Sequence, residues 1–206
     1  EHAGELGADL VVLSTHGRLG LREWLFGSVA QRVLQRSAPP VFLLQPTPDG
    51  QAPDFRPERA LLFLDSSPAD AAGLAAAERL AQQCGMQLHL LMCIPTRATL
   101  SGDRAATATL LPATMNAVLD LAERGAQDEL QSHLARLQGS GLKATAEVAR
   151  GDSLEQLLEA ARRQHADLIC LTTRGRTGLG ALGTDEVAPK ILTRAPGAFL
   201  LIPAVE

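Results

Sequence analysis

Aromatic side chains are scarce in this sequence of 206 residues: they make up 3% of it, and tyrosine is absent. Proteins that bind single-stranded nucleic acids stack the bases on such side chains. The formal net charge of -4 also gives no electrostatic attraction for phosphodiester chains or anionic membrane surfaces. We therefore expect neither a nucleic acid nor a membrane as a partner.

Long apolar runs and metal-ligand patterns are missing too. No segment approaches the roughly 20 apolar residues that cross a bilayer, and none has the layout of a signal peptide, which favours a cytoplasmic protein. The five histidines are dispersed, and the three cysteines lie in apolar contexts without metal-ligand spacing. We expect no metal site, and reduced cysteines in the core at all three positions: Cys84, Cys93 and Cys170.

What the sequence does contain is an internal repeat. Ala8-Asp9-Leu10 recurs, 158 residues later, as Ala166-Asp167-Leu168. Each copy has an apolar strand, then a polar loop with glycines, then a segment with helical spacing. In the loops, five residues of the first copy match five of the second: Thr15, Gly17, Arg18, Gly20 and Leu21 with Thr173, Gly175, Arg176, Gly178 and Leu179.

The order of elements predicts an α/β fold. From residue 59 onward, apolar strands alternate with amphipathic segments, which indicates a Rossmann-like, parallel, five-stranded sheet with helices on both faces. We predict a loop at 96–112 and a helix capped by Ser153. The other predicted elements are strands at 60–64, 87–94, 143–148 and 198–202, a strand before the second loop, and helices at 69–84 and about 115–139.

Residues 46–58 are rich in proline, glycine and charge and form the clearest linker. Residues 1–46 contain only the last elements of the plan that residues 59–206 contain in full. We therefore expect 1–46 to be the C-terminal part of a first domain, 47–58 a linker, and 59–206 a complete second domain. A full first copy would begin upstream of Glu1.

The sequence resembles the universal stress protein family in its tandem-domain form. ATP-binding members carry Gly, two residues, Gly, nine residues, and Gly-Ser or Gly-Thr. Here Ser14-Thr15-His16-Gly17 is followed by nine residues and Gly27-Ser28, so the first copy departs only at Ser14. Leu64-Asp65-Ser66, at the end of a predicted strand, also matches. The resemblance implies the fold of the adenine nucleotide α-hydrolase group.

For the first copy, the resemblance implies a site for ATP with Mg²⁺ in a complete domain. A glycine loop before a helix N-terminus suits phosphate, although any strand–helix junction in an α/β protein also uses glycine and a capping serine. The implied phosphate-binding residues are Ser14, Gly17, Arg18, Gly20, Gly27 and Ser28.

The second copy departs further, because Asp185-Glu186 stand where the family has Gly-Ser. Carboxylates suit a helix start but repel phosphate. The resemblance gives Asp65 a contact with adenine and ribose, while a turn-forming aspartate is the alternative. We expect no cofactor at this degenerate second site, which comprises Asp65, Gly175, Arg176 and Gly178.

The resulting function is a stress-response regulatory module, either binding a nucleotide of the ATP or AMP type or independent of nucleotides. One alternative is an enzyme of the α-hydrolase group that hydrolyses ATP or transfers adenylate; another is a cytosolic appendage of a transporter or sensor kinase. We assign no catalytic residue, because no Walker loop or Ser-His-Asp order is found and the segment after Leu64 lacks glycine. Weak ATPase activity in a longer protein stays open.

The final strands of the two copies, 41–44 and 198–202, are short and strongly apolar. Exposed strand edges of this kind tend to pair, and the family commonly pairs through them. We predict that they meet antiparallel, within one chain as a pseudo-dimer or across a homodimer. The alternative is that each strand is interior to a sheet of its own.

Overall fold

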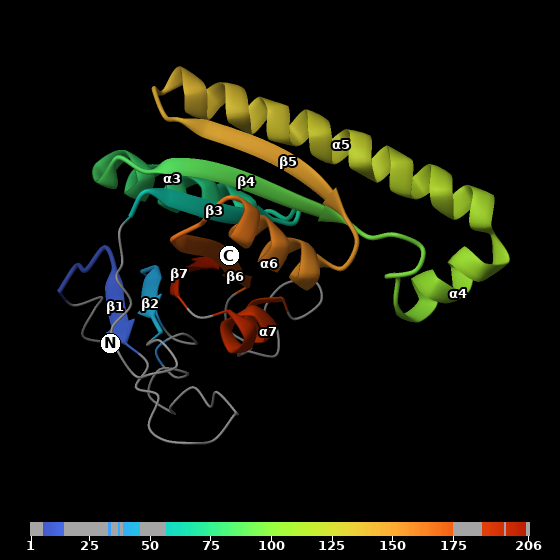
Figure 1. The fold of residues 1–206 in the computed structure, drawn as a ribbon, viewed down its shortest axis with the longest axis horizontal. Helices are drawn as coiled ribbons and strands as arrows, with labels where there is room; N and C mark the ends of the chain where they lie inside the picture. Colours follow the sequence, from blue (N-terminus) through green and yellow to red (C-terminus); the bar gives the residue numbers. More distant parts are fainter. Residues whose placement is uncertain are drawn as a thin grey trace.

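The computed structural model describes residues 6–14, 33, 37, 39–45, 57–174, 187–195 and 197–204. Its strands form one seven-stranded sheet in the order β1-β2-β7-β6-β3-β4-β5 (Figure 1). The strands are β1 Val11–Ser14, β2 Val41–Leu44, β3 Arg59–Leu64, β4 Gln87–Ile94, β5 Ala144–Arg150, β6 Leu168–Arg174 and β7 Ala198–Ala204. The helices are α3 Asp70–Cys84, α4 Gly102–Leu110, α5 Pro112–Gly139, α6 Ser153–Arg163 and α7 Val187–Arg194.

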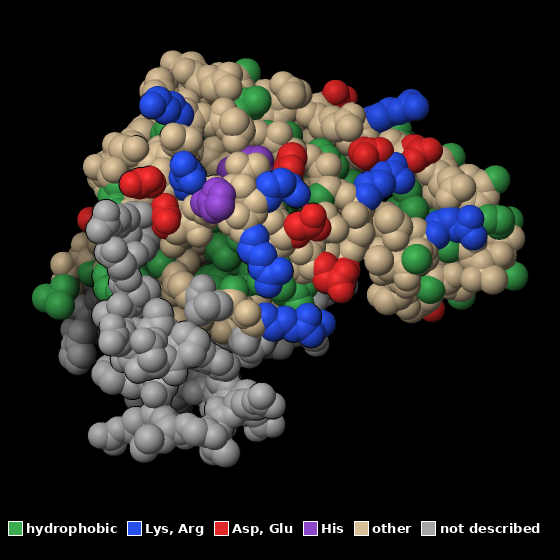
Figure 2. Space-filling view, in the orientation of Figure 1, with side chains coloured by type: hydrophobic (Ala, Val, Ile, Leu, Met, Phe, Trp, Pro, Cys, Tyr) green, Lys and Arg blue, Asp and Glu red, His purple; other side chains and the backbone are tan. Residues whose placement is uncertain are grey.

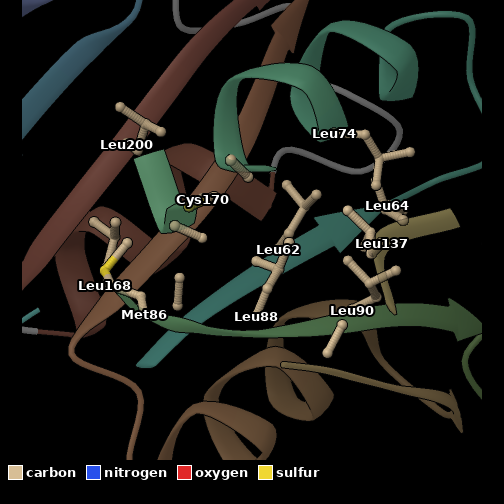
Figure 3. Close-up of a cluster of buried hydrophobic side chains, with 14 of the residues drawn as sticks. Leu62, Leu64, Leu74, Met86, Leu88, Leu90, Leu137, Leu168, Cys170 and Leu200 are labelled. Atoms are coloured by element: carbon tan, nitrogen blue, oxygen red, sulfur yellow. The ribbon is translucent and has the colours of Figure 1, made fainter. Parts of the chain in front are cut away.

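The five strands from β3 to β7 pair in parallel, as predicted for an α/β fold. Alternate residues of each strand point to opposite faces of the sheet. One face packs against α3 and α5, and Figure 3 shows Leu62, Leu90 and Cys170 gathered there with Leu74 of α3. The other face packs against α6 and α7. Both faces are therefore covered, which explains why the inner strands are mostly apolar, whereas the edge strand β5 also carries polar and charged residues.

The strand β2 joins the sheet in the opposite direction. It pairs antiparallel with β7, with Val41 opposite Leu201 and Leu44 opposite Ala198. The predicted antiparallel pairing of 41–44 with 198–202 is thus confirmed within one chain, and the alternative of two separate sheets is wrong. On its other side β2 pairs in parallel with β1.

Two local predictions are corrected. The segment 96–112 is not a loop throughout, since α4 forms from Gly102 to Leu110. Three alanines within α4 and the aspartate in its first turn favour a helix, and they outweigh the turn-forming bias of the serine and threonines of the segment. The N-cap of α6 is Asp152 rather than Ser153. The Asp152 carboxylate accepts a hydrogen bond from the Glu155 amide at 3.0 Å.

The helix α3 ends as predicted at Gly85, whose φ of 68° lies in the left-handed region that glycine adopts without strain. The cysteine next to it, Cys84, is exposed, which corrects its predicted core position. Cys93 is half-buried and Cys170 buried, and all three are free thiols.

The helix α5 extends past the sheet, together with α4 (Figure 1). Val118 and Ala122 of α5 are exposed, whereas Leu119, Ala126, Leu130 and Leu137 of the same helix are buried. Figure 2 shows hydrophobic side chains on the surface of this projecting end. Large exposed side chains in α4 and the first turns of α5 are Leu110, Leu111, Val118 and Leu121.

Among the described residues, the structure contains no helix that combines the length and the apolar character needed to cross a membrane.

Candidate functional site

The strand order reverses between β3 and β6. The chain leaves β3 into α3 on one face of the sheet, whereas β6 leads toward α7 on the other face. The two crossovers diverge at the carboxyl ends of these strands, and ligands of open α/β sheets bind in the crevice that results. We call this place the switch-point crevice; Asp65 directly follows β3 there.

The turn from β3 into α3 is closed by its own side chains. The Ser67 amide donates to the Asp65 carboxylate at 3.2 Å, and the Asp65 amide donates to the Asp70 carboxylate at 3.1 Å. Ser66 has a φ of 57°, a left-handed conformation that non-glycine residues rarely adopt. The turn therefore holds two carboxyl groups close together at the crevice.

Asp70 is 3% exposed, and its Oδ1 has no hydrogen-bond partner. Burial raises the pKa of Asp70 to about 7, and the neighbouring charge of Asp65 adds to the shift. Hydrogen bonds from the Asp65 and Ser66 amides lower the pKa of Asp70, but by less than burial raises it. Asp70 is therefore partly protonated near neutral pH, and as a carboxylic acid it can donate a hydrogen bond.

A third carboxyl group comes from α5. Glu129 accepts a hydrogen bond from the Ser66 hydroxyl at 2.9 Å, and the same hydroxyl lies 3.9 Å from the Met92 sulfur of β4. Acidic groups and hydroxyls thus gather at the described part of this position in the sheet, where Asp70 itself is buried. Such groups accept hydrogen bonds from hydroxyl and amino groups, and they repel phosphate. Among the described residues, no cluster of potential ligands is arranged to hold a metal ion.

The helix α3 approaches β6 very closely beside the crevice. A Cβ atom on Gly73 would lie 2.5 Å from Cγ2 of Thr172. Because threonine is branched at Cβ and has few rotamers, it cannot easily move away. Gly73 therefore sets the distance between α3 and β6.

The predicted site residues lie at opposite edges of the sheet. Asp65 stands at the carboxyl end of β3. Ser14 ends β1 beside Leu44, and Leu44 is opposite Ala198, where β7 begins. Since β7, β6 and β3 run in parallel, Ser14 lies at the edge where β3 begins. The structure therefore does not bring Ser14 and Asp65 together.

The other predicted site residues lie outside the described residues: Gly17, Arg18, Gly20, Gly27, Ser28, Gly175, Arg176 and Gly178. Asp185 and Glu186 do so as well.

Sequence reasoning missed three members of the crevice. Asp70 stands five residues after Asp65, where the helix begins, and this position could have drawn attention to it. Gly73 is an isolated glycine within a helical pattern. Glu129 gave no signal, because only the packing of α5 on the sheet brings it to the β3–α3 turn.

The family model described as "Universal stress protein family" matches residues 1–45 and 57–203. A search of curated proteins found no match. Among solved structures, the chain is similar to a universal stress protein from Archaeoglobus fulgidus DSM 4304, with a TM-score of 0.69 and 16% identity. That alignment covers 98% of this chain and 65% of the other, so this chain spans less than two thirds of that relative.

Shorter relatives align with most of their length. Universal stress protein UspA from Lactobacillus plantarum has a TM-score of 0.58 and 21% identity over 71% of this chain and 98% of its own. A member of the family from Burkholderia pseudomallei has a TM-score of 0.51 and 25% identity over 74% of this chain and 100% of its own. These likenesses agree with the fold, and the family match covers most of the sequence. The chain belongs to the universal stress protein family.

Proposed function

We propose that the protein is a cytoplasmic, non-catalytic regulatory module of the stress response, built from two copies of one fold. Residues 1–46 are the end of the first copy and residues 59–206 the second. In this proposal the loop of the first copy binds the phosphates of ATP with Mg²⁺ when that copy is complete, and the switch-point crevice of the second copy does not bind ATP.

The observation that carries the proposal is the acidic lining of the crevice. Asp65, Asp70 and Glu129 gather there, and the negative charges of Asp65 and Glu129 repel phosphate. In the sequence, Asp185-Glu186 add two carboxylates at the position where phosphate-binding relatives carry Gly-Ser. By contrast, Gly17, Gly27 and Ser28 keep the composition that suits a phosphate.

The test is calorimetry of Mg-ATP with a protein in which the first copy is complete, and with two variants of that protein. Gly27→Asp places a carboxylate in the first loop and should abolish binding, with little loss of stability. Asp65→Ala, a change at the predicted site of the second copy, should leave binding unchanged. If Asp65→Ala abolishes binding and Gly27→Asp does not, the assignment of the two copies is wrong.

Two further outcomes separate the alternatives. Absence of ATP binding to the unmodified protein with a complete first copy would favour the nucleotide-independent form of the module. Steady release of phosphate from ATP, lost in Asp65→Ala, would favour an enzyme of the α-hydrolase group.

A further inference from the structure

A pocket of about 310 Å³ lies at the edge of the sheet opposite the switch-point crevice. It is lined where β3, β4 and β5 begin and by the residues that precede β6. Ligand pockets span roughly 300–1,000 Å³, so this one suits a small molecule. We call it the amino-edge pocket.

The backbone around the amino-edge pocket is held by hydrogen bonds between strands. The Gln87 amide donates to the Glu58 carbonyl at 2.8 Å, and the Leu88 amide to the Lys143 carbonyl at 2.9 Å. The Asp167 amide donates to the Arg59 carbonyl at 2.9 Å. These main-chain groups are therefore satisfied, and side chains remain to contact a ligand.

The charge of the lining has one sign. Arg59 and Lys143 are its charged members, and no carboxylate is among the residues that line the pocket. Three acidic residues lie next to the lining. Glu58 precedes Arg59 in the chain, Asp167 accepts hydrogen bonds from the Glu58 and Arg59 amides at 3.1 and 2.9 Å, and Glu147 Oε1 lies 3.2 Å from His89 Nε2. Because the two charges within the lining itself are both positive, the lining favours an anion.

The rest of the lining is apolar or neutral. Leu88, Leu142 and Ala144 contribute buried hydrocarbon. His89 is 7% exposed, its Nδ1 lies 2.7 Å from the Thr145 hydroxyl, and burial lowers the pKa of its imidazole. A bare inorganic anion would leave the apolar part of the pocket uncovered, whereas an alkyl chain would cover it.

We propose that the amino-edge pocket binds a small aliphatic carboxylate. Its carboxylate lies between Arg59 and Lys143, and its alkyl chain packs over the small exposed parts of Leu142 and Ala144. This site is separate from the crevice and loop proposed above for nucleotides.

The experiment is an NMR titration of the whole chain with sodium hexanoate. The expected result is a dissociation constant of about 1 mM, typical of a ligand of this size, with amide shifts confined to the starts of β3, β4 and β5. Hexanamide has the same shape without the charge and should bind at least about tenfold more weakly. Inorganic phosphate and hexylammonium should cause no shifts at these residues.

Two variants test the contacts. Lys143→Gln, at an exposed position, and Arg59→Gln should each weaken hexanoate binding several-fold. Arg104→Gln removes a cation from the distant, exposed surface of α4 and should not change it. Equal binding of hexanamide, or of phosphate, would overturn the proposal, as would the absence of shifts at about 20 mM hexanoate.

Discussion

Asp70 links the stability of the fold to pH. Its pKa is raised to about 7 in the folded chain from an ordinary value of 3.8. Between these values the folded protein binds more protons than the unfolded chain, so the free energy of unfolding falls as pH rises. The contribution of Asp70 to the free energy of unfolding is fully present below about pH 4 and is lost above about pH 7.

This predicts that Asp70→Asn flattens the pH dependence of stability. From pH 5 to pH 8 the unmodified protein should lose on the order of 1–3 kcal/mol more than the variant, since an ionised, buried carboxylate lacks a full set of partners. Urea unfolding at both pH values measures the difference. Asp128→Asn, at an exposed position of α5, should behave like the unmodified protein. Parallel pH profiles for Asp70→Asn and the unmodified protein would contradict the assignment.

Gly73 provides a second prediction at the scale of single residues. Alanine stabilises most helix interiors relative to glycine, by up to about 1 kcal/mol. At position 73, however, the added methyl group meets Thr172 at 2.5 Å. Gly73→Ala should therefore destabilise the protein by about 1–3 kcal/mol, as measured by thermal unfolding.

The chain offers matched controls for this change. Gly125 lies in α5 with no atom within 4 Å of an added Cβ, so Gly125→Ala should be neutral or stabilising. Thr172→Ser removes the methyl group that clashes and should restore part of the stability of Gly73→Ala. Equal effects of alanine at positions 73 and 125 would rule out the steric explanation.

At the scale of elements, the first turn of α6 depends on one side chain. The Asp152 carboxylate satisfies the Glu155 amide, whereas Ser153 lies inside the helix. Asp152→Ala should lower the free energy of unfolding by about 1 kcal/mol. Ser153→Ala should leave it nearly unchanged; a larger effect of Ser153→Ala than of Asp152→Ala would place the cap on the serine after all. Chemical denaturation monitored by circular dichroism measures both.

Some helices and strands could be predicted from sequence patterns and others could not. Strands β3, β4 and β7 were predictable because apolar runs bounded by turn residues have few other uses in an α/β chain. The pairing of β2 with β7 was predictable because both strands are short and apolar and because the family commonly pairs through its final strands. The start of α5 was less predictable: it was expected at about residue 115 and lies at Pro112, because an apolar periodicity does not fix where a helix begins.

The crevice was less predictable than the fold. Asp65 follows a strand and could be identified, but the burial of Asp70 depends on how the β3–α3 turn closes. The contact of Glu129 depends on the packing of α5. Both are tertiary properties without a local signature.

At the scale of the whole molecule, the sheet joins residues 41–44 to the far end of the chain. Val41 is 1% exposed and Leu43 is fully buried, and β2 has a partner strand on each side. A protease site inserted between residues 50 and 51 should therefore yield, after cleavage, two pieces that elute together in size-exclusion chromatography. Leu43→Asp buries a charge in this contact and should release the smaller piece. Separation of the unmodified pieces without denaturant would show that the pairing is not stable.

The partnership of β2 with β7 also has a consequence for synthesis. Phe42 lies opposite Leu200, so nearly the whole chain must leave the ribosome before β2 meets its antiparallel neighbour. At the usual rate of about 5–20 residues per second, this takes roughly 10 to 30 s. During that interval the apolar side chains of β2 remain uncovered on that side and open to nascent-chain aggregation, so among the described strands β2 has the greatest need of a chaperone.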